Sequence, residues 1–87
     1  RTAASFYRTS AGAEIDLVLD LPGGKKWAIE IKSGLAPKLG KGFYNALEDV
    51  IPDRSFVVYA GSDRYPVSKE TDAISLTELV QKLKEVK

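Results

Sequence analysis

The chain has 87 residues, enough for one small domain, and its hydrophobic content of 44% is ordinary for a globular protein. It contains no cysteine and no histidine, which excludes disulfides, thiolate catalysis, zinc–sulfur sites and imidazole ligands, so any bound metal must be held by oxygen. Thirteen Lys and Arg residues against twelve Asp and Glu residues give a net charge of +1, which alone says little about a nucleic-acid partner.

Three β-strands are predicted in the first third of the chain. Residues 6–9 are aromatic and β-prone, and residues 10–13 form a turn. Residues 14–21 and 27–32 alternate between apolar and polar side chains, which is typical of half-buried strands. The aliphatic face of these two strands is expected to contain Ile15, Leu17, Leu19, Leu21, Trp27, Ile29 and Ile31.

A helix and a buried strand are predicted next. After a loop of residues 33–42 that is rich in Gly, Pro and Lys, apolar residues recur at helical spacing from Phe43 to Ile51, and Pro52 ends this helix. The apolar run within residues 55–60 does not alternate, which is typical of a strand that is covered on both faces.

The last third is expected to hold short strands at residues 65–67 and 73–74 and a closing helix. Ser75 and Glu78 have the spacing of a capping box. The apolar face of the closing helix is expected to contain Leu76, Leu79, Val80, Leu83 and Val86. The order of elements predicts an α/β fold with a mixed sheet: an antiparallel meander of three strands, a crossover helix, a parallel fourth strand and flanking helices.

The turn at Pro22-Gly23-Gly24 sets how the two alternating strands pair. We predict a three-residue hairpin loop, formed by a type I turn and a glycine with positive φ. A two-residue loop would place Asp16 beside Ile31 and mix an acid with the core, which is physically worse. The opposed pairs are then Leu21 with Lys25, Asp20 with Lys26, Val18 with Ala28, Asp16 with Glu30, and Glu14 with Lys32.

This register gathers Glu14, Asp16, Glu30 and Lys32 on one face at one end of the hairpin. Opposed carboxylates repel each other, so Lys32, a bound cation or a raised pKa must offset the repulsion. A pair of acids with only oxygen ligands suits Mg²⁺ or Mn²⁺. A lysine on the same face can orient or deprotonate a water, or neutralise charge on a phosphate. The pattern therefore predicts metal-assisted hydrolysis of phosphodiesters.

A half-solvated antiparallel sheet is the alternative explanation for these strands. Glu-Ile-Lys is common in such sheets, and an E-x-K sequence alone is a weak signal. The ordered combination favours the site: an acid on one strand, a short hairpin, Glu30 and Lys32 on the next strand, and then a crossover helix.

Several blocks of the chain resemble one known family. They are Phe6-Tyr7-Arg8-Thr9, Gly12-Ala13-Glu14-Ile15-Asp16, Trp27-Ala28-Ile29-Glu30-Ile31-Lys32, Lys41-Gly42-Phe43, Leu47-Glu48-Asp49 and Arg64-Tyr65-Pro66. They resemble the domain of unknown function at the C-terminus of many bacterial and archaeal AAA-type P-loop ATPases, which is assigned to the PD-(D/E)XK restriction-endonuclease-like superfamily. The resemblance covers nearly the whole chain, from Phe6 to the closing helix.

The resemblance implies a Mg²⁺-dependent nuclease acting on DNA, or an inactive DNA-binding or regulatory domain of such an ATPase. Asp16 and Glu30 would be the metal-binding acids, Lys32 would complete the catalytic set, and Glu14 would be an auxiliary acid. The resemblance also implies an ATPase module in the same chain and a further helix upstream of Arg1. The chain starts without methionine, and we interpret residues 1–87 as one domain of a longer protein.

Basic residues near the acids are candidates for contacts with a DNA backbone. Lys38 and Lys41 lie in the loop after the third strand, and Arg8, Lys25 and Lys26 would extend a basic rim. Ordinary solubilising charge explains these residues equally well. No secretory signal and no apolar run of about 18 residues is present, so we expect a cytoplasmic location without a membrane partner.

Overall fold

The computed structural model describes residues 2–86, which form one six-stranded sheet and two α-helices. The strands are β1 (Ala3–Arg8), β2 (Glu14–Leu21), β3 (Lys25–Ile31), β4 (Arg54–Val58), β5 (Tyr65–Pro66) and β6 (Thr71–Ile74), and the helices are α1 (Lys41–Val50) and α2 (Leu76–Lys84). The strand order across the sheet is β1-β2-β3-β4-β6-β5.

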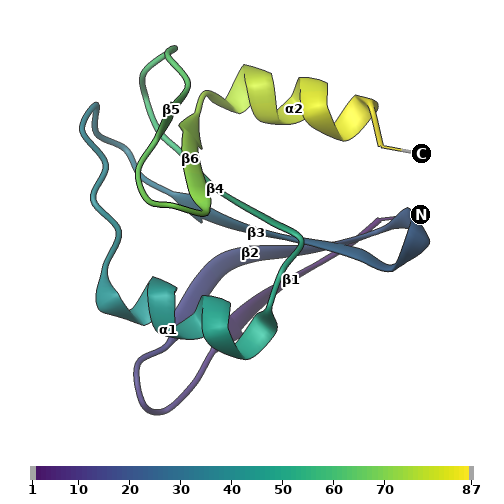
Figure 1. Cartoon of the computed structure of the whole chain (residues 1–87), viewed down its shortest axis with the longest axis vertical. Helices are drawn as coiled ribbons and strands as arrows, with labels where there is room; N and C mark the ends of the chain where they lie inside the picture. The colour runs from purple at the N-terminus through teal and green to yellow at the C-terminus, as the bar shows by residue number, and fades with distance from the viewer. Residues whose placement is uncertain (1, 87) are drawn as a thin grey trace.

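The strand directions confirm the predicted mixed sheet. β1, β2 and β3 are antiparallel neighbours, and β4 pairs parallel to β3 after the chain has passed through α1. β6 continues the parallel part, and the short β5 is antiparallel to it at the far edge. In Figure 1 the sheet lies between the two helices, with α1 on one face and α2 on the other.

Each helix buries its own part of the core. The core on the α2 side contains Leu19, Leu21, Trp27, Ile29, Phe56, Val58, Ile74 and Leu79. The core on the α1 side contains Ala13, Ile15, Val18, Ala28, Phe43 and Ala46. The sequence alternation predicts a polar face on the hairpin, but α1 covers the central part of this face, around Val18 and Ala28. Full burial of a side chain as large as Phe43 contributes about 1.5–3 kcal/mol to folding.

The strand β4 has the double coverage that its unbroken apolar run predicts. Phe56 and Val58 pack in the core on the α2 side, and Val57 packs with Tyr59 and Ala73 on the opposite side. All three residues of the run from Phe56 to Val58 are buried. β4 is thus the central strand that fixes the position of β3 on one side and β6 on the other.

The β2–β3 hairpin has the predicted three-residue loop, but the turn type differs from the prediction. Leu21 pairs with Lys25, as the loop length requires. Gly23 and Gly24 both have positive φ, 81° and 76°, where the prediction gave a positive φ to one glycine. The φ and ψ of Gly23, 81° and 13°, match the third residue of a type II turn, which explains glycine at this position.

A β-bulge interrupts β2 next to the predicted site. The flanking β1–β2 pairs are Ser5 with Val18 and Tyr7 with Ile15. Two residues of β2, Asp16 and Leu17, therefore lie opposite the single residue Phe6. The regular β2–β3 ladder ends at the pair of Leu17 and Ile29, so the predicted pairing of Asp16 with Glu30 and of Glu14 with Lys32 is not part of it.

The bulge also corrects the predicted aliphatic face. Ile15 packs on the α1 side with Val18, whereas Leu19 and Leu21 pack on the α2 side, because one extra residue reverses the alternation of β2. Ile31 was expected on the aliphatic face but is 58% exposed, since it lies beyond the end of the β2–β3 ladder.

Three details of the helices differ from the sequence prediction. Leu76 and Val80 were expected on the apolar face of α2 but are 62% and 44% exposed. Ile51 was expected to continue the apolar face of α1, but it adopts the left-handed conformation, with φ 51° and ψ 63°, and is exposed. Ser75 caps α2 by accepting a hydrogen bond from the Glu78 N–H at 3.1 Å. The Glu78 carboxylate does not complete a capping box, because it pairs with Arg64 and Lys82.

Candidate functional site

Asp16 and Glu30 are joined by reciprocal hydrogen bonds between β2 and β3. The backbone N–H of Asp16 donates to Glu30 Oε1 at 3.3 Å, and Asp16 Oδ2 accepts from the backbone N–H of Ile31 at 2.9 Å. Each carboxylate thus accepts a backbone hydrogen bond just beyond the end of the regular β2–β3 ladder. The structure brings these two predicted residues together, although by a different route from the one predicted.

The environment of Glu30 disfavours its charged form. Its side chain is buried, and burial raises the pKa of its carboxyl above the ordinary value of 4.5. The nearby negative charge of Asp16 raises this pKa further, while the hydrogen bond from the Asp16 backbone and the charge of Lys32 lower it. The two carboxylates are thus close enough to repel each other, and Asp16 is the exposed member of the pair.

Lys32 lies beside the acid pair, and Glu14 lies on its edge. The Lys32 Nζ is 3.8 Å from Glu30 Oε2, which is a long ion pair with a partly exposed lysine. Glu14 is the first residue of β2 and is the Cα partner of Arg8 on β1. Arg8 therefore lies at the same end of the sheet as the acids, as the predicted basic contact requires.

The other basic candidates divide between the two ends of the hairpin. Lys41 begins α1, and Lys38 is an exposed residue in the preceding loop. Lys25 and Lys26 follow the turn at the opposite end of the hairpin from Asp16, so the prediction that they extend the same basic rim is wrong. Lys26 instead pairs with Asp20 at 3.4 Å.

The start of α1 is held against the start of β2 by a glycine contact that sequence reasoning did not identify. A side chain at Gly42 would clash with the carbonyl oxygen of Gly12, so the helix approaches the β1–β2 turn closely. At the other end of the helix, the Tyr7 hydroxyl donates to Asp49 Oδ2 at 2.8 Å. These contacts fix α1, and with it Lys41, at the end of the sheet that carries the acid pair.

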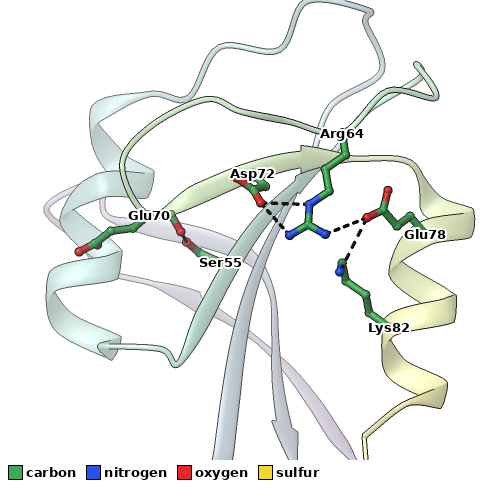
Figure 2. A network of polar contacts seen from close by, with 6 residues as sticks. All are labelled: Ser55, Arg64, Glu70, Asp72, Glu78 and Lys82. Carbon is green, nitrogen blue, oxygen red and sulfur yellow. Dashed lines mark hydrogen bonds and ion pairs between the residues drawn. The ribbon is translucent and has the colours of Figure 1, made fainter.

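A second polar cluster ties α2 to the far side of the sheet, as Figure 2 shows. Arg64 pairs with Asp72 on β6 at 3.0 Å and with Glu78 on α2 at 3.3 Å. Lys82 reaches the same Glu78 carboxylate at 3.7 Å. Arg64, Asp72, Glu78 and Lys82 each have a partner of opposite charge, so we interpret these four residues as a structural clamp.

Within residues 2–86, neither a group of three or more acidic side chains that would hold a metal nor a helix long and apolar enough to cross a membrane is found. The acid pair therefore offers two carboxylates, and any cation bound there would complete its shell with water or with ligands from a substrate.

These observations define an α/β domain in which Asp16, Glu30 and Lys32 lie close together at the end of the regular β2–β3 ladder. The chain belongs to the family described as a domain of unknown function (DUF4143), whose profile matches residues 1–79. Uncharacterized proteins from Mycobacterium tuberculosis and Mycobacterium bovis are each 31% identical to it over 75 residues, which is 86% of this chain. The chain spans 17% of the length of these two relatives. No solved structure matches it significantly.

Proposed function

We propose that this domain is a metal-dependent nuclease-like domain of the restriction-endonuclease-like superfamily, and that it hydrolyses DNA phosphodiester bonds. The observation that carries the proposal is the convergence of Asp16 and Glu30 beside Lys32. Two carboxylates and a lysine are the side chains that metal-assisted phosphodiester hydrolysis uses. They come together here although the regular pairing of their strands has ended.

The donor set of the acid pair fits a hard divalent cation such as Mg²⁺ or Mn²⁺. Asp16 uses Oδ2 and Glu30 uses Oε1 to accept backbone hydrogen bonds. A further ligand could bind Asp16 Oδ1 and Glu30 Oε2, whose ion pair with Lys32 is long. Burial and, after it, the negative charge of Asp16 raise the pKa of Glu30, and the charge of Lys32 offsets this effect only in part. A divalent cation at this place would favour both ionised carboxylates and would act as a Lewis acid on a phosphate.

Lys32 has the position of an auxiliary group in such a reaction. Its ammonium group lies 3.8 Å from Glu30 Oε2 and is partly exposed, so it can turn toward a water or a phosphate oxygen next to the acids. There it would orient the attacking water or balance the negative charge that develops on phosphorus. The substrate backbone would run past Arg8, Lys38 and Lys41, which lie around the same end of the sheet or in the loop that leads to α1.

The rest of the protein is part of the proposal. The resemblance to the ATPase-associated family implies an AAA-type ATPase module in the same chain, and this chain spans 17% of the length of its relatives. We propose that the ATPase module delivers or remodels the DNA on which this domain acts.

Cleavage of DNA by the longest available form of the protein tests the nuclease proposal. Supercoiled plasmid is incubated with Mg²⁺ or Mn²⁺, and Asp16→Asn, Glu30→Gln and Lys32→Met are compared with the surface control Glu48→Gln. We expect metal-dependent nicking that the three site variants lose and the control retains. Isothermal titration of Mn²⁺ gives an independent readout, because binding should require both Asp16 and Glu30. Absence of cleavage with either metal, together with absence of Mn²⁺ binding, would refute the proposal.

A catalytically inactive DNA-binding or regulatory domain is the second candidate. The observation in its favour is that both carboxylates already have a structural task, since each accepts a backbone hydrogen bond between β2 and β3. In this case the acids stabilise the strand pair, and DNA contacts depend on Arg8, Lys38 and Lys41 alone. DNA affinity should then fall steeply with salt and with Lys38→Ala plus Lys41→Ala, but should not change with Asp16→Asn or with Mg²⁺.

A further inference from the structure

The two edges of the sheet differ in how they are protected. The far edge is β5, which has two residues and includes Pro66, a residue without a backbone N–H. The near edge is β1, a strand of six residues without proline or lysine, in which every residue except Tyr7 is exposed. Natural proteins rarely leave such an edge open, because its unpaired backbone groups are ready to accept another strand.

The backbone of β1 presents its free groups at alternate residues. The N–H of Thr9, just after the strand, donates to the Ala13 carbonyl at 2.9 Å, so Thr9 points its backbone groups toward the neighbouring strand. The backbone groups of successive residues in a strand point alternately toward and away from the neighbouring strand. This alternation holds along β1, because the extra residue of the bulge belongs to β2. The N–H and C=O groups of Ala4, Phe6 and Arg8 therefore point away from β2, toward the open edge.

We propose that two copies of this chain associate through β1, edge to edge and antiparallel, to form one continuous sheet around a twofold axis at Ser5. Residues that lie opposite each other across such an axis share a face of the sheet. Ala4 of one copy then faces Phe6 of the other, and all outward-pointing groups of these two residues form hydrogen bonds with each other. The two Ser5 residues face each other at the axis.

The order of side chains in β1 suits this pairing. The first half of the strand carries small side chains and the second half carries large ones: Ala3, Ala4 and Ser5, then Phe6, Tyr7 and Arg8. An antiparallel copy therefore places a small residue opposite a large one on both sides of the axis. Phe6, which is 69% exposed in the single chain, would cover Ala4 of the other copy. The two Arg8 side chains would lie at opposite ends of the interface, which avoids repulsion between like charges.

The contact is small, so the dimer should be weak and dependent on concentration. One pair of short strands buries less surface than the about 1,200 Å² of stable interfaces. Sedimentation velocity of the 87-residue chain, over a series up to millimolar concentration, should show a reversible monomer–dimer equilibrium. Ala4→Pro removes an outward-pointing donor in each copy and should raise the dissociation constant at least about tenfold, whereas the matched control Ala4→Ser keeps the N–H and should change it little.

A cross-linking experiment tests the register without depending on the proline variant. The chain has no cysteine, so Ser5→Cys introduces a single thiol at the axis. Directly opposed residues that are not hydrogen-bonded have Cα atoms about 4.5 Å apart, within the range of disulfides. Mild oxidation should give a disulfide dimer with Ser5→Cys and little dimer with Ala3→Cys. A monomer at all concentrations, a dimer that Ala4→Pro leaves unchanged, or equal cross-linking at positions 3 and 5 would overturn the proposal.

Discussion

The side chain of Asp16 accepts a hydrogen bond from the backbone of the strand that carries Glu30, and the side chain of Glu30 accepts one from the backbone of Asp16. Asp16 Oδ2 accepts from the Ile31 N–H at 2.9 Å, and Glu30 Oε1 accepts from the Asp16 N–H at 3.3 Å. Because each acid supports the backbone that positions the other, a loss of activity after mutation of either one has two explanations, a lost ligand or a displaced strand. Stability measurements on matched variants separate the two.

Replacement of Asp16 should destabilise the fold only when the hydrogen-bond acceptor is lost. Asp16→Ala leaves the Ile31 N–H without its partner and should lower the free energy of unfolding by about 1 kcal/mol, a value reduced by the exposure of the site. Asp16→Asn keeps an acceptor oxygen and should lose less. Urea unfolding measures both, with Asp20→Ala on the same strand as the control, because the exposed ion pair of Asp20 contributes little. Equal losses for Asp16→Ala and Asp16→Asn would contradict this role of Asp16 as a hydrogen-bond acceptor.

Ionisation of Glu30 should cost folding stability. Burial and the neighbouring Asp16 raise the pKa of Glu30 above 4.5, so the folded chain keeps this proton at pH values where the unfolded chain has released it. The protonated Glu30 therefore contributes its full stabilisation below pH 4.5, and the free energy of unfolding falls as pH rises from 4.5 through the raised pKa. Glu30→Gln carries no proton to lose and still offers an acceptor to the Asp16 N–H.

Unfolding of the wild type and Glu30→Gln across acid to neutral pH checks this sign. The difference in stability should shift in favour of Glu30→Gln as pH rises through the window above 4.5. If Mg²⁺ binds the acid pair, it should stabilise the wild type at neutral pH and leave Glu30→Gln unchanged. A difference that does not vary with pH would contradict the inferred environment of Glu30.

The sequence predicts the hairpin correctly up to the bulge and fails beyond it for a physical reason. Loop length fixes the register from Leu21 to Leu17. Past that point Ile15 and Leu17 are both aliphatic, so the alternation in the sequence continues although the strand has gained a residue. Coverage of the second face by α1 decides where Ile15 packs, and that tertiary contact leaves no local signal.

The sequence also predicts part of the candidate site correctly. Asp16, Glu30 and Lys32 meet because they lie near the open end of one hairpin, which loop length and residue count determine. Lys25 and Lys26 do not meet them, because the same count places both at the turn. The hydrogen bond from the Ile31 N–H to the Asp16 side chain was not predicted, because it lies beyond the end of the regular β2–β3 ladder.

Gly42 is predicted to be intolerant of a side chain despite its helical position. Replacing glycine by alanine inside a helix usually stabilises it by about 1 kcal/mol. At Gly42 the added Cβ would clash with the Gly12 carbonyl oxygen, so Gly42→Ala should instead destabilise the fold by about 1–3 kcal/mol. Gly34→Ala is the control, because a Cβ there meets no atom and the backbone is not in the left-handed region. Thermal unfolding that ranks Gly42→Ala at or above wild type would contradict the close approach of α1 to the β1–β2 turn.

Ile51 is predicted to be a position where a mutation stabilises the protein. It ends α1 in the left-handed conformation, with φ 51°, and its N–H donates to the Leu47 carbonyl at 2.9 Å. This conformation destabilises the fold by about 1–2 kcal/mol when a branched residue adopts it. The Ile51 side chain is 78% exposed, so its burial offsets little of this cost. Ile51→Gly should therefore raise the free energy of unfolding by about 1 kcal/mol and the melting temperature by about 4–8 °C. Ile51→Ala removes the same exposed atoms but keeps the Cβ, so it should not reproduce the gain. Equal melting temperatures for the glycine and alanine variants would show that the backbone at this helix end carries no such strain.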